Sequence, residues 1–419
     1  MLNLVDAAMV GTLGTAAVAA VGIGSNVNFQ CQAAVQSFGA GVQALSARRW
    51  GEGEAGRARA AEPLNAALLL VLALGTLLAL LLAQFAEAYL GALQGDAAVL
   101  ALAVPYLQAR LCAVPAVGCN YAFRGFWNAT GRPEIYLHTI ASMHACNAVL
   151  SLALIFGVPA LGVPALGVLG AGIGTAAATW LGTALYLLQG WRRARSAGFL
   201  RLPSRATART LARLSVSQAA TTTLYASGMT LFFKIVGTIG TSELAAANVL
   251  LNLLLVMALP CWGMGLSAGA LAGRAMGRKD PQDADAWVWQ VARLTSAGMG
   301  LFGLVFVFFP ALCLTPFLAD ESARLAAAGP LRMVGAAVAV DSLAAVMQSA
   351  LSGVGAARMV AIASFCSQWL VFLPCAWYCA IVKGCSLTTL WAVYTLFRCL
   401  NALLFAALWR RKGWQSIRM

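Results

Sequence analysis

The sequence predicts an all-α polytopic membrane protein, built from two six-helix bundles that repeat one another. Three observations support this prediction. Hydrophobic residues make up 61% of the 419 residues and charged residues only 10%, apolar runs of membrane-spanning length follow one another, and one pattern recurs at about half the chain length. Soluble domains are about half apolar and a quarter charged. The composition therefore argues against a soluble enzyme or a nucleic-acid-binding domain.

Apolar runs divide the chain into membrane spans. A bilayer core of about 30 Å needs roughly 20 helical residues, so the first run, Leu2–Val10, is too short to cross alone. We expect the chain to begin inside a helix, giving a twelve-helix architecture whose first helix is N-terminally truncated. Eleven further spans are predicted, at Ala16–Ala47, Leu64–Phe85, Ala97–Trp127, Ile135–Phe156, Leu169–Trp191, Thr207–Val236, Ser242–Ala272, Ala286–Phe309, Ser322–Ser352, Met359–Val382 and Leu387–Trp409. Kinks are expected at Pro105, Pro115, Pro260 and Pro374.

Basic residues predict the orientation. The loops after even-numbered helices and the C-terminal tail hold 21 arginines and lysines, whereas the loops after odd-numbered helices hold two, Arg324 and Lys383. Basic loops stay on the cytoplasmic side of a membrane. The even loops and the C-terminus are therefore expected in the cytoplasm, and the net charge of +14 is explained by topology without a nucleic-acid partner.

The chain contains an internal repeat. Val10–Ala20 aligns with Val236–Ala246 at an offset of 226 residues. The same offset pairs Gly39 with Gly265, Leu45 with Leu271, Arg48 with Arg274 and Gly51 with Gly277. Each copy should hold six crossings, which predicts an N-terminal lobe at 1–192, a cytoplasmic linker at 193–206 and a C-terminal lobe at 207–419. Two like bundles around a central cleft are suited to alternating access.

Two acids lie well inside the predicted spans, Asp6 and Asp341. An Asp at the centre of a membrane helix costs roughly 2.5 to 3.5 kcal/mol on insertion scales, so an acid there suggests a function. We expect both to take part in transport or ion coupling. The alternative is that each is a structural partner for one of the arginines within spans: Arg110, Arg293, Arg332 or Arg398. At the repeat offset Asp6 falls on Phe232, so the repeat does not preserve this acid.

Polar side chains form stripes on two predicted helices. They comprise Asn28, Gln32, Gln36 and Gln43 in the second helix, and Gln218, Thr222 and Tyr225 in the seventh. Lipid cannot satisfy such groups. They are expected either to line a substrate cavity or to make hydrogen bonds between helices.

The fifth predicted helix has a polar face of its own. His144, Asn147 and Ser151 follow one another at i, i+3 and i+7, so they share one side of the helix. His144 could titrate near neutral pH and replace a missing acid. A hydrogen-bonded packing histidine is the alternative.

Several motifs resemble those of the multidrug and toxic compound extrusion (MATE) family. They are Asp-x-x-x-Val-Gly-x-x-Gly-x-x-x-x-Ala-Ala from Asp6, Gly-x-x-x-x-x-x-x-Ala-Arg-x-x-Gly from Gly39 to Gly51, the stretch Phe123–Pro133, and Asn147 followed by Gly167–Thr175. The resemblance extends into the second half over Ala245–Gly277 and covers nearly the whole chain. It implies a two-lobed antiporter that expels organic, often cationic, compounds against H⁺ or Na⁺.

The resemblance also implies roles for individual residues. Asp6, Asn147 and Thr175 match family positions for ion coupling, but Ser151 stands where the family has a second acid, which favours H⁺ over Na⁺. Asp341 matches an acid of the tenth helix, and Tyr225 lies near a position where some members carry a Glu. No cofactor beyond the coupling ion is expected. The expected partners are small organic molecules and the lipid bilayer of the cell membrane, with the protein as a monomer.

Two other classes of membrane protein fit the sequence less well. A lipid-linked oligosaccharide or lipid flippase of the wider superfamily has a similar layout but usually a strongly basic cavity, whereas the intramembrane charges here are few and mixed. A membrane enzyme is disfavoured because no HExxH motif and no Ser/His/Asp set is present, and both histidines lie on one helix.

Overall fold

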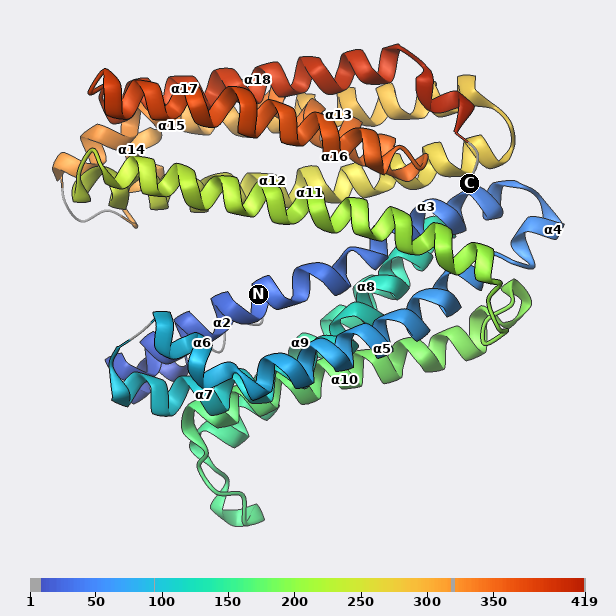
Figure 1. Cartoon of the computed structure of the whole chain (residues 1–419), viewed down its shortest axis with the longest axis horizontal. Coiled ribbons are helices and arrows are strands. Elements are labelled where there is room, and N and C mark those ends of the chain that lie inside the picture. The colour runs from blue at the N-terminus through green and yellow to red at the C-terminus, as the bar shows by residue number, and fades with distance from the viewer. Residues whose placement is uncertain (1–8, 94, 318–320, 418–419) are drawn as a thin grey trace. The chain divides into compact units, whose positions relative to one another are not determined.

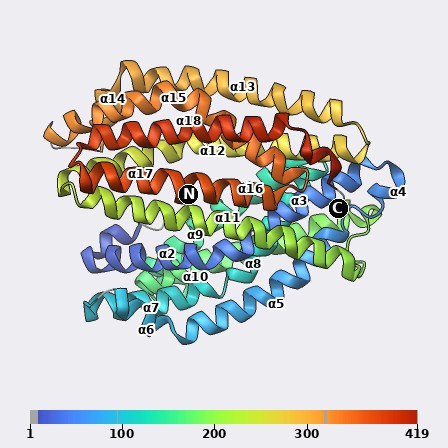
Figure 2. The same ribbon diagram turned by 45° about the horizontal axis from the view of Figure 1, so that its top comes forward.

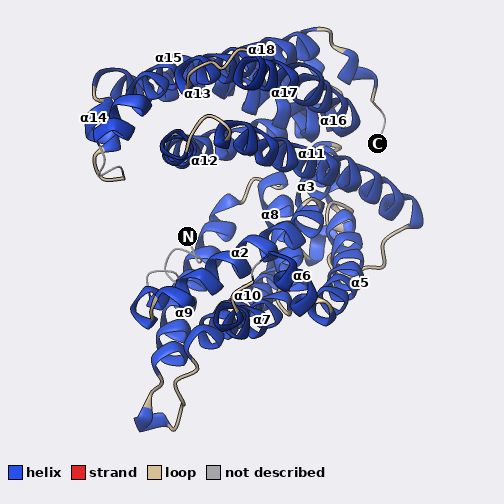
Figure 3. Ribbon diagram, turned by 60° about the vertical axis from the view of Figure 1, so that its left-hand side comes forward, coloured by secondary structure: helices blue, strands red, loops and turns tan. Residues whose placement is uncertain are grey.

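A computed structural model describes residues 9–93, 95–317 and 321–417, and over these ranges the chain is built from helices joined by short connections (Figures 1 and 3). Asp6 lies outside the described residues. The α-helices are α2 (Thr15–Gln36), α3 (Phe38–Gly51), α4 (Glu54–Arg57), α5 (Glu62–Gln84), α6 (Ala86–Leu93), α7 (Ala97–Leu111), α8 (Val114–Ala129), α9 (Pro133–Phe156), α10 (Gly167–Arg193), α11 (Arg205–Gly237), α12 (Thr241–Gly277), α13 (Pro281–Phe308), α14 (Pro310–Leu314), α15 (Glu321–Gly353), α16 (Ala357–Phe365), α17 (Leu373–Trp377) and α18 (Leu387–Arg410).

The helices confirm the predicted all-α membrane architecture. Eight described helices are long and apolar enough to cross a membrane, and α7 with α8 makes a ninth if the bent pair is one span. Each of the eleven predicted spans coincides with a helix or a set of consecutive helices. The span expected at Ala16–Ala47 is two helices, α2 and α3, separated by Ser37. The hydroxyl of Ser37 donates to the carbonyl oxygen of Ala34, a contact that often bends helices.

The prolines of the predicted kinks have different local effects. Pro115 opens α8, and α7 and α8 are bent by 45° at this point. The helices continue without a break through Pro105 and Pro260. Around Pro374 the chain takes the wider π-helical form at Cys366–Phe372 and Tyr378–Val382, which flank α17. Pro lacks a backbone N–H, so each of these prolines leaves one helical hydrogen bond unmade.

Contacts between Cα atoms group the chain into two compact units, residues 1–46 with 54–219 (unit 1) and residues 47–53 with 220–419 (unit 2). In unit 2, α12, α13, α15 and α18 run side by side (Figures 1 and 2). The core of this unit includes an aromatic cluster in which Phe232 is fully buried and contacts Phe372, Trp391 and Tyr394, with ring centroids 5.2 to 5.7 Å apart.

Unit 2 also contains a close contact between the ends of α3 and α12. A Cβ atom on Gly51 would lie 2.0 Å from the carbonyl oxygen of Arg274, and one on Gly277 would lie 2.0 Å from the carbonyl oxygen of Arg48. The contact is therefore reciprocal. Its four residues are those that the sequence repeat pairs at the offset of 226, so equivalent residues of the two copies meet here.

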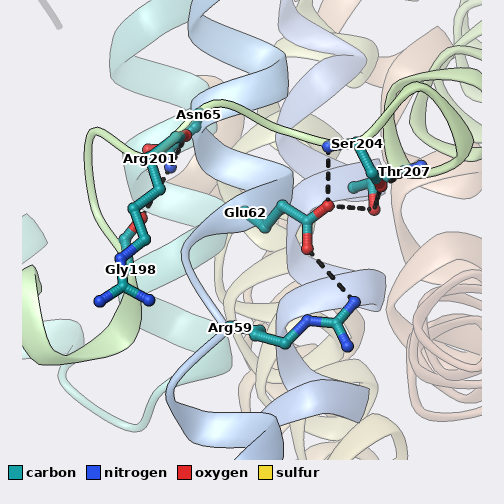
Figure 4. A network of polar contacts seen from close by, with 7 residues as sticks. All are labelled: Arg59, Glu62, Asn65, Gly198, Arg201, Ser204 and Thr207. Atoms are coloured by element: carbon teal, nitrogen blue, oxygen red, sulfur yellow. Dashed lines mark hydrogen bonds and ion pairs between the residues drawn. The ribbon is translucent and has the colours of Figure 1, made fainter.

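The linker between α10 and α11, residues 194–204, is fixed to the start of α5 in unit 1 (Figure 4). The buried amide Nδ2 of Asn65 donates to the carbonyl oxygens of Gly198 (2.9 Å) and Arg201 (2.8 Å), and its Oδ1 accepts from the N–H of Leu200 (3.1 Å). One turn earlier, Glu62 accepts from the N–H of Ser204 (2.9 Å). These contacts make the linker an ordered part of unit 1.

Glu62 extends this attachment into α11 and the loop before α5. Its Oε1 also accepts from the hydroxyl of Thr207 (2.8 Å), and its Oε2 lies 3.5 Å from the guanidinium of Arg59 (Figure 4). We call Glu62 and Asn65 the linker clamp. Sequence reasoning missed both residues, although a polar Asn65 within the apolar run of a predicted span was a signal that could have drawn attention to it.

Replacing Asn65 with alanine is expected to release the linker. The change removes three hydrogen bonds and leaves buried partners unsatisfied, at about 1 to 3 kcal/mol for a group left without a partner. Trypsin should then cleave the linker arginines roughly tenfold faster or more, measured by limited proteolysis of purified protein. Asn26→Ala, at an exposed site on α2, serves as the control. Unchanged cleavage in Asn65→Ala would contradict the role of the clamp.

Candidate coupling and substrate sites

A buried polar cluster forms in unit 1 where α9 and α10 pack together. Two glycines of α10 permit the approach: a Cβ atom on Gly170 would lie 2.3 Å from the carbonyl oxygen of Leu154, and one on Gly174 would lie 2.9 Å from the hydroxyl of Ser151. Small residues allow backbones of membrane helices to come this close. The packing sets Thr175 of α10 opposite Asn147 of α9.

Asn147 is the centre of this cluster. Its Nδ2 donates to the hydroxyl of Ser151 (3.1 Å) and to the hydroxyl of Thr175 (3.0 Å). Thr175 in turn donates to the carbonyl oxygen of Ala171 (3.0 Å). All three side chains of the cluster, Asn147, Ser151 and Thr175, are buried. The structure thus brings together three of the residues singled out by the sequence, and both amide hydrogens of Asn147 are committed to hydroxyl groups.

Asp6 itself, the acid expected to complete this cluster, lies outside the described residues. Its counterpart at the repeat offset is informative, because Phe232 is fully buried within the aromatic cluster of unit 2. An acid at that point would be surrounded by rings and would have no water, so its burial would be costly. The loss of the acid from the second copy of the repeat has a clear physical reason in this packing.

Asp341, the second acid of the sequence analysis, is paired in the structure. On α18, Arg398 donates to it twice, from Nε to Oδ1 (2.6 Å) and from Nη2 to Oδ2 (2.7 Å). Both side chains are largely buried, at 18% exposed for Asp341 and 23% for Arg398. A bidentate pair of this kind is a strong charge-assisted contact and carries no net charge. Of the four arginines considered as structural partners, Arg398 is the one that binds Asp341.

A small cavity of about 20 Å³ adjoins this ion pair, with Tyr394 and Thr395 among its lining residues. The space is enough for about one water molecule. Within the described part of the chain, the buried hydroxyl of Thr395 has no hydrogen-bond partner, so a water here would satisfy it. Tyr225 of α11 interacts with the side chain of Tyr394 and so lies beside the ion pair of Asp341 and Arg398.

The polar stripe of the second predicted helix is divided by the break at Ser37. Asn28 is buried, and its Oδ1 has no hydrogen-bond partner among the residues that the structure describes. Gln32 and Gln36 are half-buried, and Gln36 donates to Gln32 over 3.4 Å. Gln43 lies beyond the break and is buried. Whether this stripe lines a substrate cavity or makes hydrogen bonds between helices therefore stays a prediction.

The two remaining predicted cavity residues lie on α9 and α11. His144 is half-buried one turn before Asn147, and Gln218 is half-buried in the middle of α11. Both positions lie deep within helices that the sequence predicted as spans. The structure leaves their proposed part in binding substrates as a prediction.

Sequence reasoning missed a polar attachment of α11 to the π-helical segment. The buried Nε2 of Gln368 donates to the carbonyl oxygen of Tyr225 (3.1 Å), and the indole N–H of Trp369 donates to that of Leu224 (3.2 Å). A Cβ atom on Gly228 would lie 2.3 Å from Gln368, so a glycine at this position leaves the necessary space. π-Helical segments often occur at functional sites.

Comparisons with known proteins agree on one family. The MatE family model matches residues 1–153 and 218–378. A probable multidrug resistance protein NorM of Bradyrhizobium diazoefficiens is 28% identical over 411 residues, covering 93% of this chain and 85% of that protein. The multidrug resistance protein NorM of Burkholderia vietnamiensis is 27% identical over 417 residues, covering 93% and 85%.

Solved structures show the same fold at low sequence identity. A crystal structure of MATE in the bent conformation matches with a TM-score of 0.89 at 17% identity, covering 99% of this chain and 91% of that one. The Vibrio cholerae MATE transporter VcmN in the bent form matches with a TM-score of 0.88 at 19% identity, covering 98% and 92%. A Pyrococcus furiosus transporter of the MOP superfamily, described as having a binding pocket of reversed polarity, matches with a TM-score of 0.86 at 18% identity, covering 99% and 92%.

Proposed function

This chain belongs to the MatE family of multidrug efflux transporters, and we propose that it is an antiporter which exports small organic compounds, cations among them, in exchange for H⁺. Its six-plus-six helix repeat is suited to alternating access between the two sides of a membrane. The proposed orientation places the linker and the C-terminus in the cytoplasm, following the distribution of basic residues.

The observation that carries the proposal is the buried cluster of Asn147, Ser151 and Thr175. Among the described residues, the hydrogen bonds of this cluster join hydroxyl and amide groups. Asp6 is the acid that we propose acts with it. An acid in such surroundings can be neutralised by one proton, and the hydrogen bonds around it would then rearrange.

The coupling follows from the charge of Asp6. In its ionised form the carboxylate attracts a lipophilic cation. When the carrier opens outward, protonation of Asp6 removes this attraction and the substrate leaves. The neutral carrier then turns inward, loses the proton to the cytoplasm and binds another substrate molecule. One acid can thus serve both ligands in turn, with Asn28, Gln32, Gln36, His144, Gln218 and Tyr225 proposed to line the path.

Two observations favour H⁺ over Na⁺. Hard cations prefer carboxylate and carbonyl oxygens, whereas Ser151 supplies only a hydroxyl, which already accepts from Asn147. The other intramembrane acid, Asp341, is fully engaged by Arg398. Asp341, the described acid that lies well inside a predicted span, is therefore not free to coordinate Na⁺.

Asp6→Asn is expected to abolish export of an organic cation. The test is accumulation of ethidium in efflux-deficient cells, with and without a proton uncoupler. Wild-type protein should lower accumulation, and the uncoupler should remove this effect. Cells that express Asp6→Asn should accumulate as much ethidium as cells without the protein. Glu87→Gln, an exposed acid on α6, is the control at matched expression. If Asp6→Asn exports as well as wild type, the proposed coupling is wrong.

A further inference from the structure

The linker presents a basic and apolar surface that the transport cycle does not use. We call it the linker surface and define it as Arg195, Leu200, Arg201, Leu202, Arg205 and Arg209, all exposed. The stretch from 192 to 213 holds seven arginines and no acid. Among the described residues, no acidic side chain forms an ion pair with Arg201, Arg205 or Arg209. Their charge is therefore available to a partner outside the chain.

The apolar members of this surface are unusual for their place in the fold. Leu200 is 58% exposed and Leu202 is 91% exposed. Exposed leucines inside membrane spans face lipid chains, but these two lie in the linker, after α10 has ended at Arg193. Leu200 has a positive φ of 67°, a conformation that L side chains rarely adopt. The bond from its N–H to Asn65 holds it there.

The linker clamp keeps the surface in place. Asn65 holds the backbone on both sides of Leu200, and Glu62 holds Ser204, one residue before Arg205, and Thr207, two residues after it (Figure 4). The carboxylate of Glu62 is thus engaged by backbone and hydroxyl groups of this segment and by Arg59. Positive charge alone is enough to keep a loop on the cytoplasmic side, so a flexible loop would serve that purpose. The linker is instead ordered, with a defined outward face.

The linker surface directly follows the end of α10, and this place in the chain indicates how it lies relative to the membrane. Trp191, in the last turn of α10, is half exposed, and the guanidinium of Arg195 stacks over its ring at 4.0 Å. Tryptophans at the ends of spans lie at the level of the lipid headgroups. The arginines that follow Trp191 in the chain are therefore expected near the bilayer surface, where charges act over about 10 Å at 0.1 M salt.

We propose that the linker surface binds anionic phospholipid headgroups of the adjacent leaflet, with Leu200 and Leu202 inserted between the acyl chains. Arginine clusters directly beside a membrane helix bind acidic lipids through charge, and the fork of a guanidinium suits a phosphate group. The two leucines would add an apolar anchor that free phosphate or nucleic acid would not use. Acidic lipid would thereby hold this end of unit 1 at the membrane.

The test compares spin-labelled phosphatidylglycerol and phosphatidylcholine on the purified full-length protein in phosphatidylcholine bilayers, by electron paramagnetic resonance. Wild-type protein should prefer phosphatidylglycerol. Because each arginine near a membrane surface is worth about a fivefold change in lipid affinity, Arg201→Gln/Arg205→Gln/Arg209→Gln should lower the preference at least fivefold. Raising the salt concentration should weaken the preference of wild type more than that of the variant.

Two further variants separate this proposal from a general effect of charge. Arg410→Gln/Arg411→Gln/Lys412→Gln removes the same charge from the end of α18 and should lower the preference clearly less than the linker variant does. Leu200→Ser/Leu202→Ser keeps all the charge and should weaken the preference at high salt. Equal losses from both charge variants, or none from the linker variant, would overturn the proposal. The measurement needs no transport, so it stands or fails independently of the proposed antiport.

Discussion

Replacing Arg398 with methionine is expected to destabilise the protein strongly, while the double variant Asp341→Leu/Arg398→Met should be close to wild type. The single change leaves the Asp341 carboxylate without its two charge-assisted hydrogen bonds. Breaking one side of a buried pair costs about 3 to 5 kcal/mol, whereas apolar residues of similar volume often replace the whole pair at no cost. The unfolding midpoint in detergent, followed by tryptophan fluorescence, measures both effects.

The same pair of variants decides what Asp341 does. The sequence analysis expected a part in ion coupling, with a structural ion pair as the alternative. The observed pairing favours the structural role, so the double variant should retain ethidium export. A double variant that is as stable as wild type but no longer exports would contradict this and return Asp341 to the coupling machinery.

Gly51→Val is expected to have the second large effect. Even the first atom of the new side chain would lie 2.0 Å from the carbonyl oxygen of Arg274, and a backbone atom cannot move aside cheaply. Overpacking of a well-packed contact costs about 1 to 3 kcal/mol and occasionally more. We expect a value at the upper end, and a similar one for Gly277→Val because the contact is reciprocal.

Gly263→Ala provides the matched control on the same helix as Gly277. A Cβ atom there meets nothing within 4 Å, and alanine is the better helix former by about 1 kcal/mol. Its unfolding midpoint should equal or exceed that of wild type, while those of Gly51→Val and Gly277→Val should fall. If all three variants have the same unfolding midpoint, the close contact between α3 and α12 does not contribute to stability.

The helices could be predicted because hydrophobic runs of membrane length are a direct consequence of the bilayer. Their breaks could not. The interruption at Ser37 and the π-helical turns beside Pro374 depend on local hydrogen bonds that leave the average hydropathy unchanged. The repeat could be recognised in the sequence. Only the structure shows that its equivalent residues contact each other, with Gly51 against Arg274 and Gly277 against Arg48.

The candidate sites divide in the same way. The spacing of Asn147 and Ser151 put both on one face of a helix. In the structure Asn147 donates to Ser151 and to Thr175, which agrees with that grouping. The partner of Asp341 could not be chosen among four arginines, because Asp341 and Arg398 are 57 positions apart and the register between α15 and α18 is set by packing. The linker clamp was missed because Glu62 and Asn65 act on backbone groups far along the chain.

The proposed coupling makes a quantitative prediction. If one proton is exchanged for one monovalent cation, no net charge moves. A difference of one pH unit should then support about a tenfold concentration gradient of the cation, because each tenfold ratio corresponds to about 1.4 kcal/mol on either side of the exchange.

The most direct test is ethidium transport into proteoliposomes under an imposed gradient of either H⁺ or Na⁺. With wild-type protein, an acidic interior should drive ethidium inward in the absence of Na⁺, while a Na⁺ gradient at equal pH should not. Asp6→Asn should remove the pH-driven transport and Glu87→Gln should keep it. Transport driven by Na⁺ alone, or pH-driven transport that survives in Asp6→Asn, would contradict proton coupling through Asp6.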